Sequence, residues 1–185
     1  MGYFLKGVLG LSLFLVSWRA FSQVEISEET NYFDVSGGSK SAVVRSLTEA
    51  RKMIPGQTED YDARTNWDVQ WNFSTVRNGD TCKIDQLNIT AKIRVFLPQW
   101  IDQPNDGSAV EWWLHYVDLL RKHEAQHVKI TREGVQQIYE GLSKLAPMPC
   151  EGVAAAINAK GQLGLDTIAT NNLTLDEVTN HGISK

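Results

Sequence analysis

Hydrophobic and polar residues alternate every second position over two neighbouring parts of the chain, residues 67–73 and 82–97. This period of two is typical of β-strands with one buried face. Asn78-Gly79-Asp80, between the two runs, has the composition of a tight turn. We therefore expect a long antiparallel hairpin. The alternation changes phase between Ile84 and Leu87, which predicts a β-bulge there.

Other hydrophobic patterns predict one further strand and several helices. The expected elements are a strand at 24–35 and helices at 41–54, 110–145 and 150–163. Two prolines, a glycine and several Asp and Asn residues make 98–109 a predicted loop, and the polar tail 166–185 has no assigned element. Together these elements predict an α+β fold in which a small antiparallel sheet packs against a few helices.

The N-terminal pattern is that of a secretory signal peptide. Lys6 precedes an apolar run at 8–16, and Ala20-Phe21-Ser22 places small residues before a mature start at Gln23. The run is shorter than the roughly 20 residues of a membrane-spanning helix. The alternative is an uncleaved anchor, and a lipoprotein is not supported because the junction has no Cys. We expect residues 1–22 to be removed and residues 23–185 to form one secreted or periplasmic domain without a stable membrane span.

Composition restricts the class of partner. The chain has 185 residues, enough for one domain with a sizeable core. Its net charge of -4 and the lack of a basic run interleaved with aromatic residues argue against a nucleic-acid partner. The two cysteines, Cys82 and Cys150, are expected to form a disulfide in an oxidising compartment. The alternative, a pair of zinc ligands, is less favoured because the two are not closely spaced.

The longest predicted helix carries the sequence His123-Glu124-Ala125-Gln126-His127. Residues four apart lie on one face of a helix, so both imidazoles can bind a single zinc ion. Glu124 is offset by one position and can accept a proton from zinc-bound water. The pattern therefore predicts a zinc-dependent hydrolase. Gly134, two turns further along the same helix face, has no side chain and would allow another segment to approach closely. The alternative is a charged, solvated helix face that matches the pattern by chance.

Two histidines leave a zinc site incomplete, because catalytic zinc usually has three protein ligands and a water. The extended metzincin motif is absent, since Ile130 and Glu133 occupy the positions of its glycine and its third histidine. His115 is too far along the helix to share the ion and is interpreted as a packing or surface residue. Asp62 could orient an imidazole or form a turn. Candidates for the third ligand, by residue type alone, are Glu133, Glu140, Glu151, Asp166, Asp176 and His181.

Several motifs resemble a bacterial domain-of-unknown-function family described as predicted secreted zinc-dependent proteases. They are Tyr61-Asp62-Ala63-Arg64-Thr65 with Trp67, Leu97-Pro98-x-Trp100, Trp112-Trp113, the His-Glu-x-x-His segment and Asp176-x-x-Thr179-x-His181-Gly182. The resemblance covers nearly all of the chain after residue 22, although Leu175 replaces a tyrosine of the family. It implies a zincin-like fold with His181 as third ligand, and Asp176, Glu151 and Glu133 remain the alternatives.

The expected function is that of an exported zinc metallopeptidase. His123, His127 and His181 would hold Zn²⁺, and Glu124 would act as general base on a peptide or protein substrate, with cell-wall peptide or amide bonds as a variant. Tyr116 and Tyr139 are candidates for oxyanion stabilisation, with nothing in the sequence favouring either. The alternative function is a non-catalytic envelope or binding module with structural or vestigial zinc, closed by a fourth ligand such as Asp176.

Overall fold

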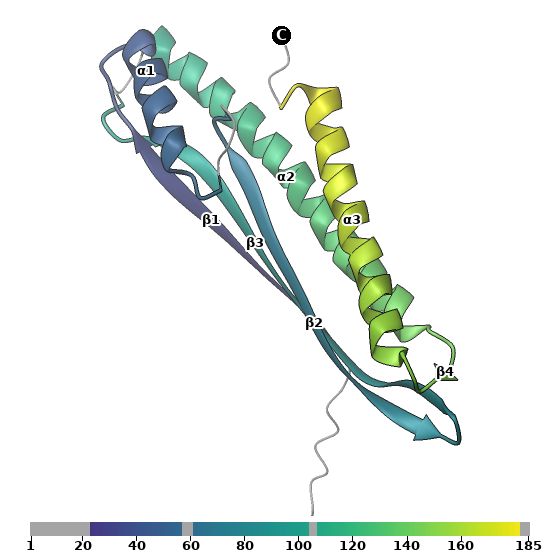
Figure 1. Ribbon diagram of the computed structural model, residues 1–185. Helices are drawn as coiled ribbons and strands as arrows, with labels where there is room; N and C mark the ends of the chain where they lie inside the picture. Colours follow the sequence, from purple (N-terminus) through teal and green to yellow (C-terminus); the bar gives the residue numbers. More distant parts are fainter. Residues whose placement is uncertain (1–22, 57–60, 104–106, 182–185) are drawn as a thin grey trace, which may run out of the picture.

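The computed structural model describes residues 23–56, 61–103 and 107–181, so the expected signal peptide at 1–22 lies outside the described residues. In chain order the elements are β1 (Gln23–Val35), α1 (Lys40–Ala50), the 3-10 helix η1 (Arg51–Met53), β2 (Arg64–Asn78), β3 (Thr81–Trp100), α2 (Ser108–Ser143), β4 (Met148–Pro149) and α3 (Val153–Thr179). Figure 1 shows an elongated molecule in which α2 and α3 run beside a long twisted sheet and α1 lies at one end. The predicted α+β class is confirmed.

The sheet has the order β1-β3-β2, and the short β4 pairs with the beginning of β3. β2 and β3 form the expected antiparallel hairpin. Its register shifts between Ser74 and Thr75, which face Gln86 and Ile84 and leave Asp85 as the extra residue. The predicted bulge is therefore confirmed.

The expectation of a purely antiparallel sheet is wrong, because β1 runs parallel to β3 from Gln23↔Asn88 to Val35↔Trp100. A parallel pair needs a long connection between its strands. The segment that contains α1 and β2 provides this connection. β3 is therefore the central strand, and β1 and β2 are the two edges over most of its length.

The predicted loop at 98–109 is too long at its start, because β3 continues through Pro98 to Trp100. Beyond Phe96, which pairs with Arg64 at the start of β2, the end of β3 pairs with β1 alone among the described strands. A strand with one free side tolerates a proline, since no ladder hydrogen bond is required on that side. The shorter loop is followed by α2, which begins at Ser108 and has 36 residues.

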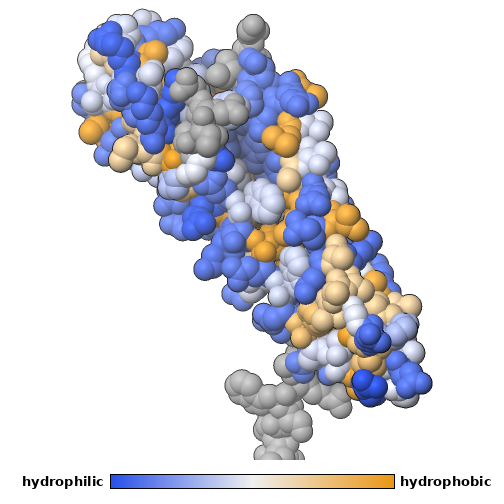
Figure 2. All heavy atoms as spheres, in the orientation of Figure 1, coloured by the Kyte–Doolittle hydropathy of each residue, from blue (hydrophilic) through white to orange (hydrophobic). Residues whose placement is uncertain are grey.

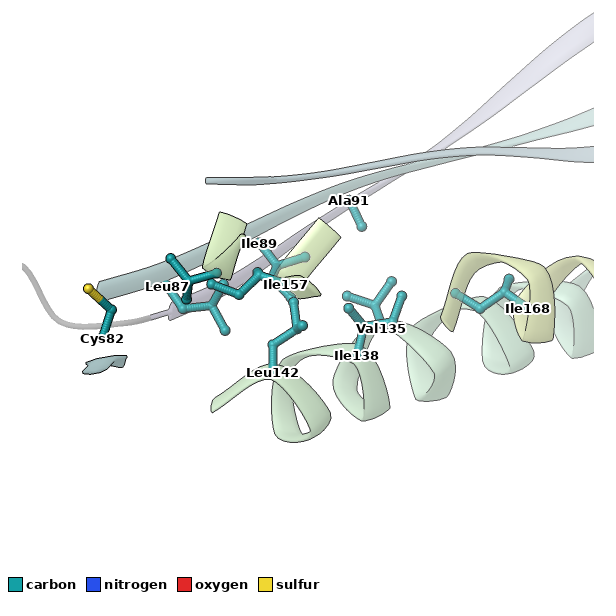
Figure 3. Close-up of a cluster of buried hydrophobic side chains, with 10 residues drawn as sticks. Cys82, Leu87, Ile89, Ala91, Val135, Ile138, Leu142, Ile157 and Ile168 are labelled. Carbon is teal, nitrogen blue, oxygen red and sulfur yellow. The ribbon is translucent and has the colours of Figure 1, made fainter. Parts of the chain in front are cut away.

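One face of the sheet is covered by the helices and the other is polar. Along β3, Leu87, Ile89 and Ile93 are buried, whereas Lys92 and Arg94 between or beside them are exposed. This alternation is typical of a sheet that packs against helices on one side. Figure 3 shows the core between the layers, where side chains of β3 lie near Val135, Ile138 and Leu142 of α2 and Ile157 of α3, and where Ile168 of α3 lies beside α2.

Helix α3 is almost twice as long as the sequence pattern predicts. The helix expected at 150–163 continues to Thr179 and includes most of the unassigned tail. Close packing against α2 holds it: a Cβ added at Gly134 would lie 2.3 Å from Ile168 Cγ1, and one at Gly164 would lie 2.3 Å from Ile138 Cγ1. The close approach predicted at Gly134 is thus confirmed.

Cys82 and Cys150 form a disulfide with a sequence separation of 68, which joins the beginning of β3 to the segment that precedes α3. The predicted pairing is therefore present, and neither sulfur is available as a zinc ligand. A disulfide is compatible with an exported protein. Among the described residues, no helix combines the length and apolar character that a membrane span requires.

Candidate metal centre

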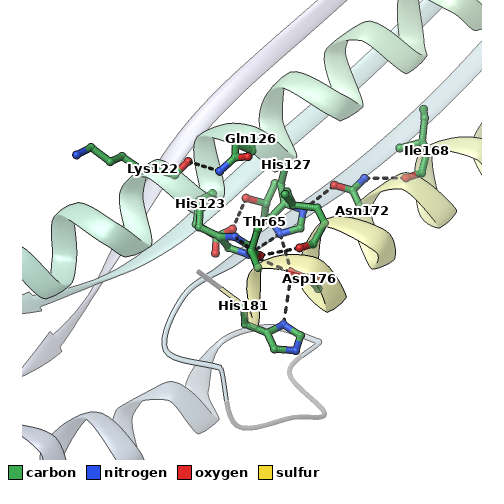
Figure 4. A network of polar contacts seen from close by, with 12 residues as sticks. Thr65, Lys122, His123, Gln126, His127, Ile168, Asn172, Asp176 and His181 are labelled. Carbon is green, nitrogen blue, oxygen red and sulfur yellow. Dashed lines mark hydrogen bonds and ion pairs between the residues drawn. The ribbon is translucent and has the colours of Figure 1, made fainter. Parts of the chain in front are cut away.

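The candidate site lies where one face of α2 meets one face of α3. α2 presents His123 and His127, one turn apart, and α3 presents Asn172, Asp176 and Thr179 at spacings of four and three residues. Both spacings place side chains on a single helix face. Figure 4 shows His123 and His127 pointing toward Asn172 and Asp176 between the helices.

Three ligand atoms converge at the centre of this interface. The Nε2 atoms of His123 and His127 lie 3.0 and 2.9 Å from Oδ1 of Asp176, and 2.9 Å from each other. The two histidines are only 4% and 7% exposed. Corners of a tetrahedron around zinc, with ligands at about 2.0–2.1 Å, lie about 3.3 Å apart. The three atoms therefore need to separate only slightly to fit the ion.

The hydrogen-bond partners of His127 assign its tautomer. The amide nitrogen of Asn172 donates to the carbonyl oxygen of Ile168 at 2.9 Å, which turns its amide oxygen toward His127. That oxygen lies 2.7 Å from Nδ1 of His127 and can only accept a hydrogen bond. Nδ1 therefore carries the proton, and in the neutral ring Nε2 presents a lone pair to the centre of the site.

The same reasoning applies to His123. The hydroxyl of Thr179 donates to the carbonyl oxygen of Leu175 at 2.6 Å, so its oxygen accepts from Nδ1 of His123 at 3.3 Å. Two neutral imidazoles with their lone pairs inward would then face one carboxylate, which places three acceptors against one another. Such an arrangement needs either added protons or a cation between the acceptors. The donor set fits a metal. Among the His, Cys, Asp and Glu side chains of the described residues, these three form the group whose atoms lie close enough to hold one ion.

Charge interactions at the centre are strong. Burial opposes ionisation of Asp176, but the hydrogen bonds to both histidines outweigh it and hold the pKa of this carboxyl well below its usual range. Burial likewise opposes the charged form of His127. Its hydrogen bonds to Asp176 and Asn172 nevertheless raise the pKa of this imidazole. In the metal-free protein the site therefore favours a proton on the ring where a metal would otherwise bind.

Glu124 lies beside the histidines and is 4% exposed. The hydroxyl of Thr65, on β2, donates to its Oε2 atom at 2.6 Å. Burial raises the pKa of Glu124, against the opposite effects of the Thr65 hydrogen bond and the two imidazoles. A carboxyl group with a raised pKa, held in one orientation, is suited to accept a proton at near-neutral pH.

His181 follows the C-terminal end of α3. It and Asn180 both have positive φ, at 55° and 49°. Its Nδ1 lies 3.4 Å from Oδ1 of Asp176, and its ring stacks on Tyr61 with centroids 4.0 Å apart. The structure thus brings His181 to the site, but Asp176 is the residue that touches both imidazoles. His181 as third zinc ligand stays a prediction.

The site opens into a cavity of about 610 Å³, lined by residues of β2, α2, α3 and the segments beside them. Figure 2 shows hydrophobic residues interspersed with polar ones along α3, and Leu173, 63% exposed, belongs to the cavity wall. Tyr116 and Tyr139, the oxyanion candidates, are not among the described lining residues. Tyr116 donates to Asp62 instead, and Tyr139 packs against the hydrophobic core.

The other predicted candidates lie elsewhere. Glu133 is exposed and pairs with Lys129 at 3.9 Å. Glu151, also exposed, precedes the start of α3 and is more than 30 Å along that helix from Asp176 at about 1.5 Å per residue. His115 is on the surface, as expected. Asp62 contacts Arg51 and Tyr116 rather than an imidazole, so a role in orienting a ligand is not supported.

Three polar residues of the site have no role assigned in the sequence analysis: Thr65 and Thr179, which appear there only as members of motifs, and Asn172, which does not appear at all. The last two belong to a polar tail with no clear apolar periodicity. Their spacing around Asp176, at four and then three residues, was the available signal. It becomes informative only when the tail is known to be helical. The partner of Glu124 depends on how the hairpin packs against α2, which no local pattern specifies.

A comparison with protein families finds one match. The family of bacterial proteins of unknown function DUF922 matches residues 30–182, from within β1 to just beyond His181, and so includes every residue of the site. Its description assigns no activity. No curated protein and no solved structure shows a significant match. Since the match covers most of the chain, the protein belongs to the bacterial family DUF922.

Proposed function

We propose that the protein is an exported, zincin-like zinc hydrolase of peptide bonds. The observation that carries the proposal is the convergence of His123, His127 and Asp176 beside the buried carboxyl of Glu124, at the edge of an open cavity. Zinc held by these three residues would supply a bound water of lowered pKa and polarise the substrate carbonyl. The disulfide between Cys82 and Cys150 is consistent with action outside the cytoplasm.

The residues of the chain have distinct parts in this mechanism. Glu124 accepts a proton from the attacking water and returns it to the leaving amine. Thr65 holds one of its oxygens through a 2.6 Å hydrogen bond, leaving the other to face the reactants. The burial of Glu124 favours its return to the protonated state, which is the state that donates to the amine.

Substrate would enter along β2. This strand is an edge of the sheet, and its residues Thr65 and Trp67 line the cavity. An edge strand can bind an extended peptide through main-chain hydrogen bonds. The proposed substrate class is therefore a peptide or an unfolded protein segment, including the peptides of the cell wall.

The test is the variant Glu124→Gln in the mature protein, residues 23–185. We expect one bound zinc per chain and no hydrolysis of a peptide library followed by mass spectrometry. Glu133→Gln, on the exposed face of the same helix, serves as the control and should retain both. Hydrolysis by Glu124→Gln would refute the assigned base. A wild-type protein that holds no zinc would refute the metal site.

A second function is favoured by one observation, the 3.4 Å distance between His181 and Asp176. With His181 as a further ligand, four protein groups would close the site and make zinc structural, as in a binding module. Cobalt in place of zinc distinguishes the two. An open site changes its visible spectrum when a hydroxamate is added, whereas a closed site does so only after His181→Ala.

A further inference from the structure

Two residues of α3 flank the carboxylate of Asp176 on the helix face that meets α2. Asn172 lies four positions before it and Thr179 three positions after it, and each contacts the outward nitrogen of one histidine. We propose that Asn172 and Thr179 are positioning residues that hold His127 and His123 in the Nδ1–H tautomer. Packing of α3 against α2 thereby prepares both ligand nitrogens. This inference rests on the proposed metal site.

Asn172 is itself fixed by the hydrophobic core. Its amide nitrogen donates to the carbonyl oxygen of Ile168, and the Ile168 side chain is fully buried against Gly134 of α2. The amide therefore cannot turn over without losing this 2.9 Å hydrogen bond. Because its oxygen is directed at His127, the constraint passes from the helix contact to the imidazole.

Thr179 acts through its hydroxyl group. The proton is used by the carbonyl oxygen of Leu175 at 2.6 Å, so only a lone pair remains for His123 at 3.3 Å. This contact is longer than the 2.7 Å between Asn172 and His127. We therefore expect the effect of Thr179 to be the smaller of the two.

Loss of either contact releases the ring nitrogen that it holds. If a histidine is free to carry its proton on Nε2, that proton points at the metal position. The metal can then bind only after the proton has moved to Nδ1 or left the ring. Groups that hydrogen-bond to the outward nitrogen of a ligand histidine typically contribute about 10- to 100-fold to metal affinity. We expect a decrease toward the upper value for Asn172→Leu and toward the lower value for Thr179→Val.

Matched substitutions separate chemistry from structure. Asn172→Asp keeps an acceptor for Nδ1 but gives up the hydrogen bond to Ile168, whereas Asn172→Leu has a similar size and loses both. The zinc affinity of Asn172→Asp should therefore be closer to that of the wild type than the affinity of Asn172→Leu. Asn171→Leu, at the exposed neighbouring position, is the control for α3 itself. Thr174 makes the same contact to the carbonyl four residues before it, at 2.9 Å, but touches no histidine. Thr174→Val therefore controls for Thr179→Val.

The measurement is zinc affinity of the mature protein by competition with a chelator. It is combined with two-bond ¹H–¹⁵N correlations of labelled histidines in the zinc-loaded protein. We expect both ligand rings to be protonated at Nδ1. In Asn172→Leu the Nδ1 proton of His127 should lose its downfield shift and exchange freely with water, and Asn172→Asp should restore both properties.

The outcomes distinguish this inference from the proposal on which it rests. If the wild-type protein binds no zinc, the metal site is refuted and this inference with it. If it binds zinc but Asn172→Leu and Thr179→Val match their controls in affinity, only the positioning role is refuted. Equal losses in Asn172→Leu and Asn172→Asp, with both variants as stable to unfolding as Asn171→Leu, would also refute it, because α3 would then be intact and the acceptor irrelevant.

Discussion

Replacing Gly134 by alanine would test the helix contact on which the site depends. The added Cβ would lie 2.3 Å from Cγ1 and 2.8 Å from Cδ1 of Ile168, whereas ordinary contact begins at 3.4 Å. Ile168 is completely buried, so its side chain cannot simply turn into solvent. Helix α3 or the side chain must move by about 1 Å, and overpacking of this kind typically costs about 1–3 kcal/mol.

Gly141 of the same helix is the matched control. A Cβ there would lie 3.7 Å from the flexible end of Lys160, an ordinary contact. Both substitutions gain the same helix propensity, about 0.8–1.0 kcal/mol. The difference between the two variants therefore isolates the packing term. We expect Gly134→Ala to be about 1–3 kcal/mol less stable than Gly141→Ala, or roughly 2–12 °C lower in melting temperature.

Urea unfolding followed by circular dichroism measures this difference, and zinc affinity is measured in parallel because Asn172 lies one turn beyond Ile168. A double-mutant cycle adds a second check. The new Cβ would be 3.6 Å from Cβ of Ile168, so Gly134→Ala combined with Ile168→Ala should be more stable than the sum of the single changes predicts. Equal stability of the two alanine variants, together with an additive cycle, would refute the reasoning.

The remaining predictions concern the disulfide and pH. Replacing Cys82 and Cys150 together by serine should lower the free energy of unfolding by about 4 kcal/mol, because the bridge closes a loop with a sequence separation of 68. Calorimetry measures this loss of stability. A loss below about 1 kcal/mol would contradict the prediction. The raised pKa of His127 stabilises the metal-free fold below pH 6.5, and this stabilisation is lost as the pH rises through that raised value. Zinc needs the deprotonated ring, so its affinity should rise over the same range; an affinity independent of pH between about 6 and 8 would refute the assignment.

The sequence predicts the elements whose hydrophobic pattern is local and strong. The alternation from Trp67 to Leu97 is sufficient for the hairpin and its bulge, and the helical spacing of residues 110–145 is sufficient for α2. The parallel pairing of β1 with β3 could not be predicted in this way. Pairing direction depends on where the chain returns after α1, and nothing in the alternation of residues 24–35 encodes that.

The residues of the site likewise fall into those that a local pattern predicts and those that depend on packing between distant segments. His123, Glu124 and His127 follow from one helical motif, because their mutual geometry is set within two turns. The third member of the cluster is different, since Asp176 comes from a helix whose apolar positions are weak and which approaches α2 most closely at glycines. Residue type alone left it among six candidates. The close packing of Gly134 against Ile168 and of Gly164 against Ile138 is consistent with the register that brings Asp176 to the histidines, and no local pattern predicts it.

Three of the contacts that hold helix α3 to the rest of the molecule lie at its beginning, its middle and its end. The disulfide at Cys150 ties down the segment that precedes it, the glycine contacts hold its middle, and the contacts of Asp176 with the two histidines hold its last turns. The disulfide and the glycine contacts do not depend on a ligand. The contacts of Asp176 with the histidines bring hydrogen-bond acceptors together, so a bound cation would strengthen them. Zinc binding and the docking of the C-terminal part of α3 should thus be one coupled equilibrium, whereas the disulfide end and the hydrophobic core provide the rigid frame in which it occurs.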